Sequence, residues 1–183
     1  IIYSLLFHVL KMRQKVVLTN LRWAFPNKDK DWYKKTMKLC YKFYTKEFLD
    51  FLSFPRNYKH SKIIFLNLEV LLSALDKKNG VILIGSHFGS FDKLFYAMHE
   101  KNIDLTGVAY KQNNKGADLF FKEIREKFIK NQLYKGGNSR LLSESLSQNN
   151  VLILLSDQDA KNKGTIVKFL SLIHISEPTR HHA

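Results

Sequence analysis

The chain has 183 residues, of which 45% are hydrophobic and 13% aromatic, and it contains a single cysteine. This length and composition suffice for one domain with a hydrophobic core, and they exclude a disordered chain and an internal disulfide. The 30 Lys and Arg residues outnumber the 16 Asp and Glu residues, which gives a formal net charge of +14. Such an excess indicates either an anionic partner (nucleic acid, acidic protein or anionic membrane surface) or a solvated basic surface.

Residues 1–10, IIYSLLFHVL, are mostly apolar, and basic residues follow at Lys11, Arg13 and Lys15. The run is shorter than the ~20 apolar residues that cross a bilayer as a helix. Two interpretations fit it equally. It is either the end of a membrane helix, followed by basic residues on the cytoplasmic side, or an amphipathic helix that packs on the core.

Residues 32–52 have the clearest helical period in the chain. One side carries an apolar stripe of Tyr33, Met37, Cys40, Tyr41, Tyr44, Phe48, Phe51 and Leu52. The other side carries Lys34, Lys35, Lys38, Lys42 and Lys46. The pattern predicts a helix whose apolar stripe, including the Cys40 thiol, packs in a core. Its basic face is either solvated or lies against anionic lipid.

After this helix the pattern changes to short apolar runs that alternate with amphipathic segments. The run at 80–86 is continuous, as in a strand buried on both faces. Further strands are expected at 103–110, 133–134, 151–156 and 165–169, with helices at 115–130 and from Ser139 onward. The alternation predicts an α/β fold with a mixed, largely parallel sheet flanked by helices, preceded by a helical N-terminal region.

Residues 170–180, LSLIHISEPTR, resemble the translation of an adapter used to prepare sequencing libraries. We interpret 170–183 as derived from that adapter, with a natural C-terminus as the alternative. Because of this origin, its histidines are left out of the candidate site. The segment's weak helical or strand patterning also predicts a loosely packed tail. On this interpretation the domain covers 11–169 and is incomplete at its C-terminus.

The segment GSHFGSFD at 85–92 contains the candidate catalytic residues. His87 and Asp92 are five positions apart, roughly 140° around a helix, so they meet only if His87 lies on a loop and Asp92 in the first helical turn. Gly89 permits a tight turn and Ser90 is a suitable N-cap. A His-Asp dyad, a structural hydrogen bond and a metal site all fit the spacing, although the chain has no H-E-x-x-H motif or cysteine cluster to support a metal. With no G-x-S-x-G motif, a dyad suits deprotonation of a substrate hydroxyl.

H-x4-D after a buried strand is similar to the signature of the glycerolipid acyltransferase superfamily. From about Arg13 to Phe169 the chain resembles the late acyltransferases of lipid A biosynthesis, of the lauroyl/myristoyl type. GSHFGSFD is similar to the family's G-H-F-G-N-W-E/D core, with Ser90 and Phe91 in place of Asn and Trp. The other matching segments are RQKVVLTNLRWAFPNKDKD (13–31), AYKQNN (109–114), YKGGNSR (134–140) and LLSDQDAKNKGTIVKF (154–169).

The resemblance implies transfer of a fatty acyl chain from acyl carrier protein to a hydroxyl of a lipid A precursor, without a metal or a cofactor. It implies that His87 is the general base and that Asp92 orients and charges it. It also assigns Arg125 to the oxyanion or a lipid A phosphate, and Asp157 to holding Arg125 or shaping the pocket. The substrate-binding segment includes Asn113 and Lys111, which keeps the charge of the family's arginine but loses its bidentate fork.

The resemblance further implies a location at the cytoplasmic face of the bacterial inner membrane. Residues 1–10 would then be what is left of an N-terminal membrane segment. The anionic lipid A precursor, the acidic carrier protein and the membrane surface would account for the basic excess. Two alternatives are an acyltransferase acting on another glycolipid or a lysophospholipid, and a basic nucleic-acid-binding domain. Against the second, the chain has no zinc-finger or RNP motif, and we expect no nucleic-acid partner.

Overall fold

The computed structural model describes residues 2–54, 56–137, 139–157, 165–169 and 172–176, with side chains described up to residue 157. The chain divides into two compact units, Ile1–His60 and Ser61–Ala183.

The first unit is helical. Its long helix α3 (Lys30–Leu52) begins where Asp29 accepts a hydrogen bond from the backbone N–H of Trp32 at 2.7 Å, as an N-cap does. This confirms the predicted helix and extends it by two residues at its start. The shorter elements are α1 (Ile2–Ser4), the π-helical turn η1 (Leu5–Val9), α2 (Gln14–Ala24) and α4 (Arg56–Lys59). Within the described part of the chain, none of the helices combines the length and the apolar character needed to span a bilayer.

The apolar stripe of α3 is covered over part of its length. Tyr33 and Tyr41 are buried, and the ring of Phe7 packs edge-on against Tyr41 with centroids 5.1 Å apart. Tyr44 and Phe48, predicted to share this core, are instead 65% and 52% exposed. They have the right helical phase, but no described segment of the helical unit covers that part of the helix.

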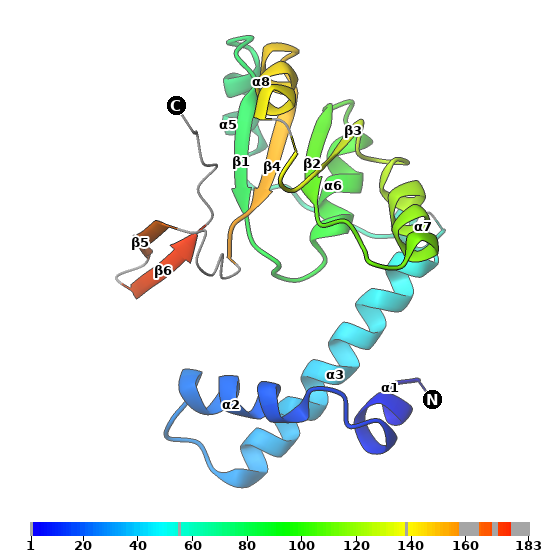
Figure 1. The fold of residues 1–183 in the computed structure, drawn as a ribbon, viewed down its shortest axis with the longest axis vertical. Helices are drawn as coiled ribbons and strands as arrows, with labels where there is room; N and C mark the ends of the chain where they lie inside the picture. The colour runs from blue at the N-terminus through cyan, green and yellow to red at the C-terminus, as the bar shows by residue number, and fades with distance from the viewer. Residues whose placement is uncertain (1, 55, 138, 158–164, 170–171, 177–183) are drawn as a thin grey trace. The chain divides into compact units, whose positions relative to one another are not determined.

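The second unit contains a four-stranded sheet in the order β1-β4-β2-β3, visible as neighbouring arrows in Figure 1. All of its pairings are parallel. The strands are β1 (Val81–Gly85), β2 (Leu105–Ala109), β3 (Asn131–Tyr134) and β4 (Val151–Leu155). The helices are α5 (Leu68–Leu75), α6 (Phe91–His99), α7 (Lys115–Arg125) and α8 (Ser139–Ser147). The predicted α/β class and the predicted helical N-terminal region are confirmed, whereas α2 and α5 were not predicted as separate helices.

The connections explain why helices lie on both faces. The chain crosses the sheet from β1 to β2 to β3 through α6 and α7, then returns to β4 through α8. Right-handed crossovers in opposite directions place their helices on opposite faces. Accordingly, α6 lines a hollow with Leu83 and Ile153, whereas Ser145 of α8 donates to Thr106 Oγ1 at 2.6 Å on the other face.

The prediction that β1 is buried on both faces is wrong. Ile82 and Ile84 are 52% and 69% exposed, whereas Val151, Leu152 and Ile153 of β4 are almost completely buried. The two strands have similar apolar sequences. They differ because β4 is central, while β1 is an edge strand of the described sheet and no described element covers its Ile82 face.

The predicted strand at 165–169 is confirmed as β5 (Thr165–Phe169). It pairs in antiparallel fashion with β6 (Leu172–Ser176), and Ile166 lies opposite Ile175. The sequence did not predict β6. The packing of this segment's side chains lies outside the described residues, so the adapter origin of the tail stays a prediction.

Candidate active site

His87 lies on the loop between β1 and α6, as predicted. β1 ends at Gly85 and α6 begins at Phe91, so the intervening residues must reverse the chain direction within one short loop. Gly89 has a φ of +64°, a left-handed conformation that glycine adopts without steric cost. The His87 side chain is 37% exposed and therefore accessible to a substrate.

Two hydrogen bonds join His87 to Asp157. The ring Nδ1 lies 2.8 Å from Asp157 Oδ1, and the backbone N–H of His87 donates to Oδ2 at 3.0 Å. The strand register explains the encounter. Gly85 of β1 pairs with Leu155 of β4. His87 lies two positions after Gly85, and Asp157 lies two positions after Leu155. The carboxyl ends of neighbouring parallel strands thus bring the imidazole and the carboxylate together.

Asp157 is held in its ionised form. Partial desolvation alone would raise the pKa of Asp157, but the hydrogen bonds from the side chain and backbone of His87 outweigh it and lower the pKa. An ionised carboxylate only accepts hydrogen bonds, so Nδ1 must carry the proton that it donates to Asp157. The neutral ring therefore keeps its lone pair on Nε2, as a general base requires.

Asp92 lies in the first turn of α6 and is half-buried. This is the predicted position, where the positive end of the helix favours an ionised carboxylate. The described hydrogen bonds of the His87 ring go to Asp157, so the pairing of His87 with Asp92 stays a prediction. Ser90 precedes α6 at the predicted cap position, but no capping hydrogen bond from its side chain is seen there.

Lys111 and Asn113 are exposed on the loop between β2 and α7. This loop follows the carboxyl end of β2, at the same edge of the sheet as His87. Asn114 caps α7 by accepting from the backbone N–H of Ala117 at 2.9 Å.

Sequence reasoning missed Asp118, which anchors this loop. Its carboxylate accepts the backbone N–H of Gln112 at 2.8 Å and the hydroxyl of Tyr134 at 2.9 Å. The hydrogen bond from Gln112 is the largest of the effects that lower the pKa of Asp118. The Tyr134 bond and the charges of Lys111 and Arg125 add to it, against a smaller opposing effect of desolvation. An acidic residue in the first turn after an Asn cap is the signal that could have identified it.

Arg125 lies away from His87. It ends α7, donates from Nη1 to Gln132 Oε1 on β3 at 2.9 Å, and stacks over Phe121 at 5.9 Å. The described contacts therefore do not include the predicted pair of Arg125 with Asp157. β3 and β1 are opposite edges of the described sheet, three strand spacings or ~14 Å apart.

A hollow of about 300 Å³ lies beside the His87 loop, between α6 and the β1–β4 pair. Ser86 and Phe88, which flank His87, line one end of it. The remaining wall is mainly apolar and includes Leu83, Ile153, Leu155, Phe91, Leu94 and Phe95. The imidazole thus lies next to a pocket whose chemistry suits a hydrocarbon chain.

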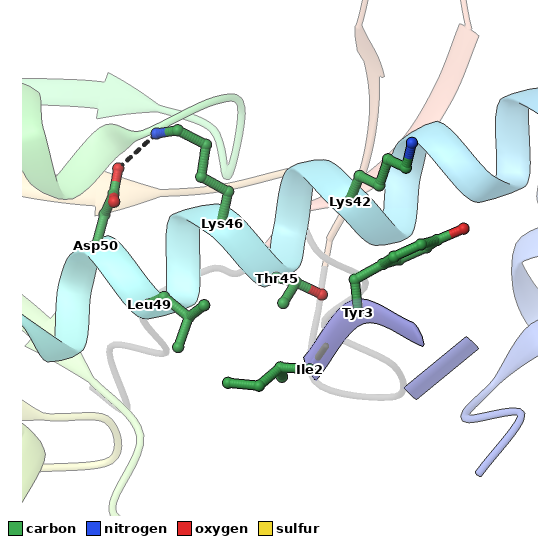
Figure 2. Close-up of a pocket in the computed structure, with 7 residues that line it drawn as sticks. All are labelled: Ile2, Tyr3, Lys42, Thr45, Lys46, Leu49 and Asp50. Carbon is green, nitrogen blue, oxygen red and sulfur yellow. Dashed lines mark hydrogen bonds and ion pairs between the residues drawn. The ribbon is translucent and has the colours of Figure 1, made fainter. Parts of the chain in front are cut away.

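A second hollow, of about 440 Å³, belongs to the helical unit. Figure 2 shows α1 contributing Ile2 and Tyr3, while Thr45 and Leu49 of α3 point toward Ile2. Lys46 extends away and forms an ion pair with Asp50 at 2.7 Å. Lys42 lies over the Tyr3 ring at 5.5 Å. The hollow therefore combines apolar walls with lysines at its rim.

A family model described as bacterial lipid A biosynthesis acyltransferase matches residues 2–179, nearly the whole chain. A search of curated proteins found no match. The matched family is made up of acyltransferases, which confirms the predicted enzyme class, and it implies a lipid A precursor and an acyl donor as substrates. The chain belongs to the bacterial lipid A biosynthesis acyltransferase family.

Proposed function

We propose that this chain transfers a fatty acyl group from acyl carrier protein to a hydroxyl of a lipid A precursor, with His87 as general base. The observation that carries the proposal is the bond from His87 Nδ1 to Asp157, which leaves Nε2 as the basic nitrogen. The exposure of His87 and the apolar hollow beside it support the same assignment.

In this reaction Nε2 of His87 takes the proton of the acceptor hydroxyl as its oxygen attacks the carbonyl carbon of the thioester. A C–O bond forms and a tetrahedral oxyanion results. When the oxyanion collapses, the C–S bond breaks, and the thiolate leaves with the proton returned by Nε2. Asp157 orients the ring, and both Asp157 and Asp92 stabilise the imidazolium that exists between the two proton transfers.

Arg125 suits a phosphate of the acceptor better than the oxyanion. An oxyanion donor must lie within ~3 Å of the reacting oxygen, whereas three strand spacings, ~14 Å, separate the strand that Arg125 contacts from the one that carries His87. A lipid A precursor is large enough to extend across that distance. Lys111 and Asn113, on the loop after β2, are placed to contact the acceptor between these two points.

A lipid A profile by mass spectrometry tests the function. Expression of the protein in a bacterial strain that lacks its own late acyltransferase should restore the mass of one acyl chain on lipid A. An unchanged lipid A accompanied by newly acylated phospholipid or another glycolipid would instead favour the alternative acceptors. No acylated product of any kind would contradict the proposal.

The basic face of α3 supports a location at the cytoplasmic surface of the inner membrane. Lys34 and Lys42 are exposed, and Lys42 and Lys46 border the second hollow (Figure 2). A lysine near an anionic bilayer contributes at most ~1 kcal/mol, and the attraction fades with salt.

Replacing Lys34, Lys38, Lys42 and Lys46 by Gln should therefore weaken co-sedimentation with vesicles that contain anionic lipid. Replacing Lys77 and Lys78, exposed in the other unit, serves as the control. Binding that neither the four substitutions nor salt reduces would show that the α3 face is not the membrane contact.

A further inference from the structure

The guanidinium of Arg125 is restricted by contacts from two different elements. Its Nη1 donates to Gln132 Oε1 at 2.9 Å, and the group lies 5.9 Å from the centre of the Phe121 ring. Phe121 lies one turn before Arg125 on α7, whereas Gln132 lies on β3. The ring contact and the hydrogen bond together limit the directions in which the guanidinium can point.

The hydrogen bond between Arg125 and Gln132 has two possible roles. Side chains alternate along a strand, so Gln132 and Tyr134 lie on one face of β3. Tyr134 donates to Asp118 in the first turn of α7, and Gln132 accepts from Arg125 in its last turn. The second contact either fastens the end of the helix to the strand or orients the guanidinium, and the chemistry of Gln132 distinguishes these roles.

Gln132 is poorly suited to a purely structural role. A guanidinium only donates hydrogen bonds, so the amide must turn its oxygen toward Arg125. The amide Nε2 is then buried, and no described residue accepts a hydrogen bond from it. A buried N–H without a partner destabilises a fold, so an apolar side chain at this position would be at least as stabilising. Fold stability alone therefore does not account for Gln132.

The partner of Arg125 is also uncharged. Lys122 and Lys130, which flank Arg125 in the chain, form ion pairs with Glu126 and Asp104, whereas no described carboxylate forms an ion pair with Arg125. An amide acceptor orients a guanidinium without neutralising it. The hydrogen bond to the amide uses one of the five N–H groups, and two others suffice for a bidentate contact with a phosphate.

We propose that Gln132 is a positioning residue for acceptor recognition: it orients the guanidinium of Arg125 and leaves its charge uncompensated, so that Arg125 binds a phosphate of the acceptor. The proposal rests on the acyl transfer proposed above, and it makes this phosphate a determinant of acceptor specificity. Gln132 acts only through Arg125, because its own donor, Nε2, is buried.

The test compares Gln132→Leu with the wild type as purified full-length enzymes, using a lipid A precursor and the same lipid after removal of its phosphates. Gln132→Leu should raise KM for the phosphorylated acceptor ~10-fold or more, as expected for the loss of one charge-assisted hydrogen bond, with kcat unchanged and Tm no lower. KM for the dephosphorylated lipid should not change. Gln148→Leu, the same substitution at an exposed glutamine, is the control.

Two further variants separate orientation from fastening. Gln132→Glu keeps an oxygen acceptor but adds a charge that neutralises Arg125, so it should also raise KM for the phosphorylated acceptor. In an Arg125→Ala background, Gln132→Leu should have no further effect on KM, because a residue that acts through Arg125 has no role without it.

Three results would overturn the proposal. The first is a Gln132→Leu enzyme with a lowered Tm and an equal rise in KM for both acceptors, as a structural role predicts. The second is a Gln132→Glu enzyme with the wild-type KM. The third is an effect of Gln132→Leu that persists in full without Arg125.

Protection by inorganic phosphate separates this proposal from the acyl transfer on which it rests. Phosphate, compared with chloride at equal ionic strength, should raise the Tm of the wild type and of Gln148→Leu more than that of Gln132→Leu. If this pattern appears while no lipid A precursor is acylated, the phosphate site stands and the proposed acceptor is wrong. If acylation proceeds but phosphate protects all three proteins equally, the role assigned to Gln132 is wrong.

Discussion

Asp157 contacts both the ring and the backbone of His87, at 2.8 and 3.0 Å. A carboxylate that holds both groups fixes the orientation of the imidazole and the position of its loop. The ion pair is partly exposed, with both side chains more than a third accessible, so its importance lies in orientation rather than in stability.

Replacing Asp157 with Asn should lower kcat by ~10²–10⁴-fold, because an amide neither stabilises an imidazolium nor requires the proton on Nδ1. KM for the acceptor should change little. Kinetics of the purified full-length enzyme would measure this. Asp104→Asn is the control, since Asp104 pairs with Lys130 at the opposite end of the sheet. A loss in Asp157→Asn that appears only in KM would contradict the orienting role.

The sequence places His87 and Asp157 at the same interval after two apolar runs, which is compatible with their pairing but does not identify it. It did not reveal that β1 and β4 are adjacent, since strands 70 residues apart in the chain carry no signal of their pairing. Asp92 is predicted as a partner from its place in the first helical turn and from the H-x4-D resemblance, and that pairing stays a prediction. The predicted loop and first-turn positions of His87 and Asp92 were confirmed, since Gly89 and the start of α6 are local features.

At the scale of elements, the loop between β2 and α7 is fixed by Asp118 rather than by its own residues. The carboxylate ties the loop backbone at Gln112 to the hydroxyl of Tyr134 on β3. The loop that carries Lys111 and Asn113 is thereby held at the carboxyl edge of the sheet.

Replacing Asp118 with Ala should raise KM for the acceptor and leave kcat nearly unchanged, because the loop is freed while His87 is untouched. Glu126→Gln, which removes an exposed ion pair with Lys122 at the end of the same helix, is the control. Equal effects of the two variants on KM would contradict the anchoring role.

The effect of Asp118→Ala on thermal stability should depend on pH. The pKa of Asp118 is lowered from its ordinary value of 3.8, so folding is stabilised by its ionised form. That contribution is complete above about pH 5 and is lost as the pH falls below 3.8 through the folded-state pKa. The difference in Tm between wild type and Asp118→Ala should therefore shrink on acidification over this range. A difference independent of pH would point to lost packing alone.

For the whole molecule, alternation of apolar runs and amphipathic segments predicted the α/β class and the four strands of the sheet. Which strand is central could not be predicted, because VILIG of β1 and VLILL of β4 are similar in composition. The exposed faces of β1 and of α3 have the same origin, since apolar patterning reports a tendency to be buried and not the presence of a covering element.

The parallel sheet gathers most of the candidate residues at one edge. His87, Lys111 and Asp157 follow the carboxyl ends of β1, β2 and β4. This is the edge at which α/β proteins bind ligands. Arg125, which contacts β3 from the end of α7, is the exception, which is why its proposed partner is a distant phosphate of the substrate.

The most direct test of His87 as the general base is the rate of acyl transfer by the purified full-length His87→Ala variant. It is compared with the wild type and with His99→Ala, which alters an exposed histidine at the end of α6. We expect a loss of ~10²–10⁴-fold for His87→Ala with an unchanged Tm, because the base is lost from a partly exposed loop, and no loss for His99→Ala. A His87→Ala enzyme that keeps most of its activity would contradict the assignment of His87 as the general base.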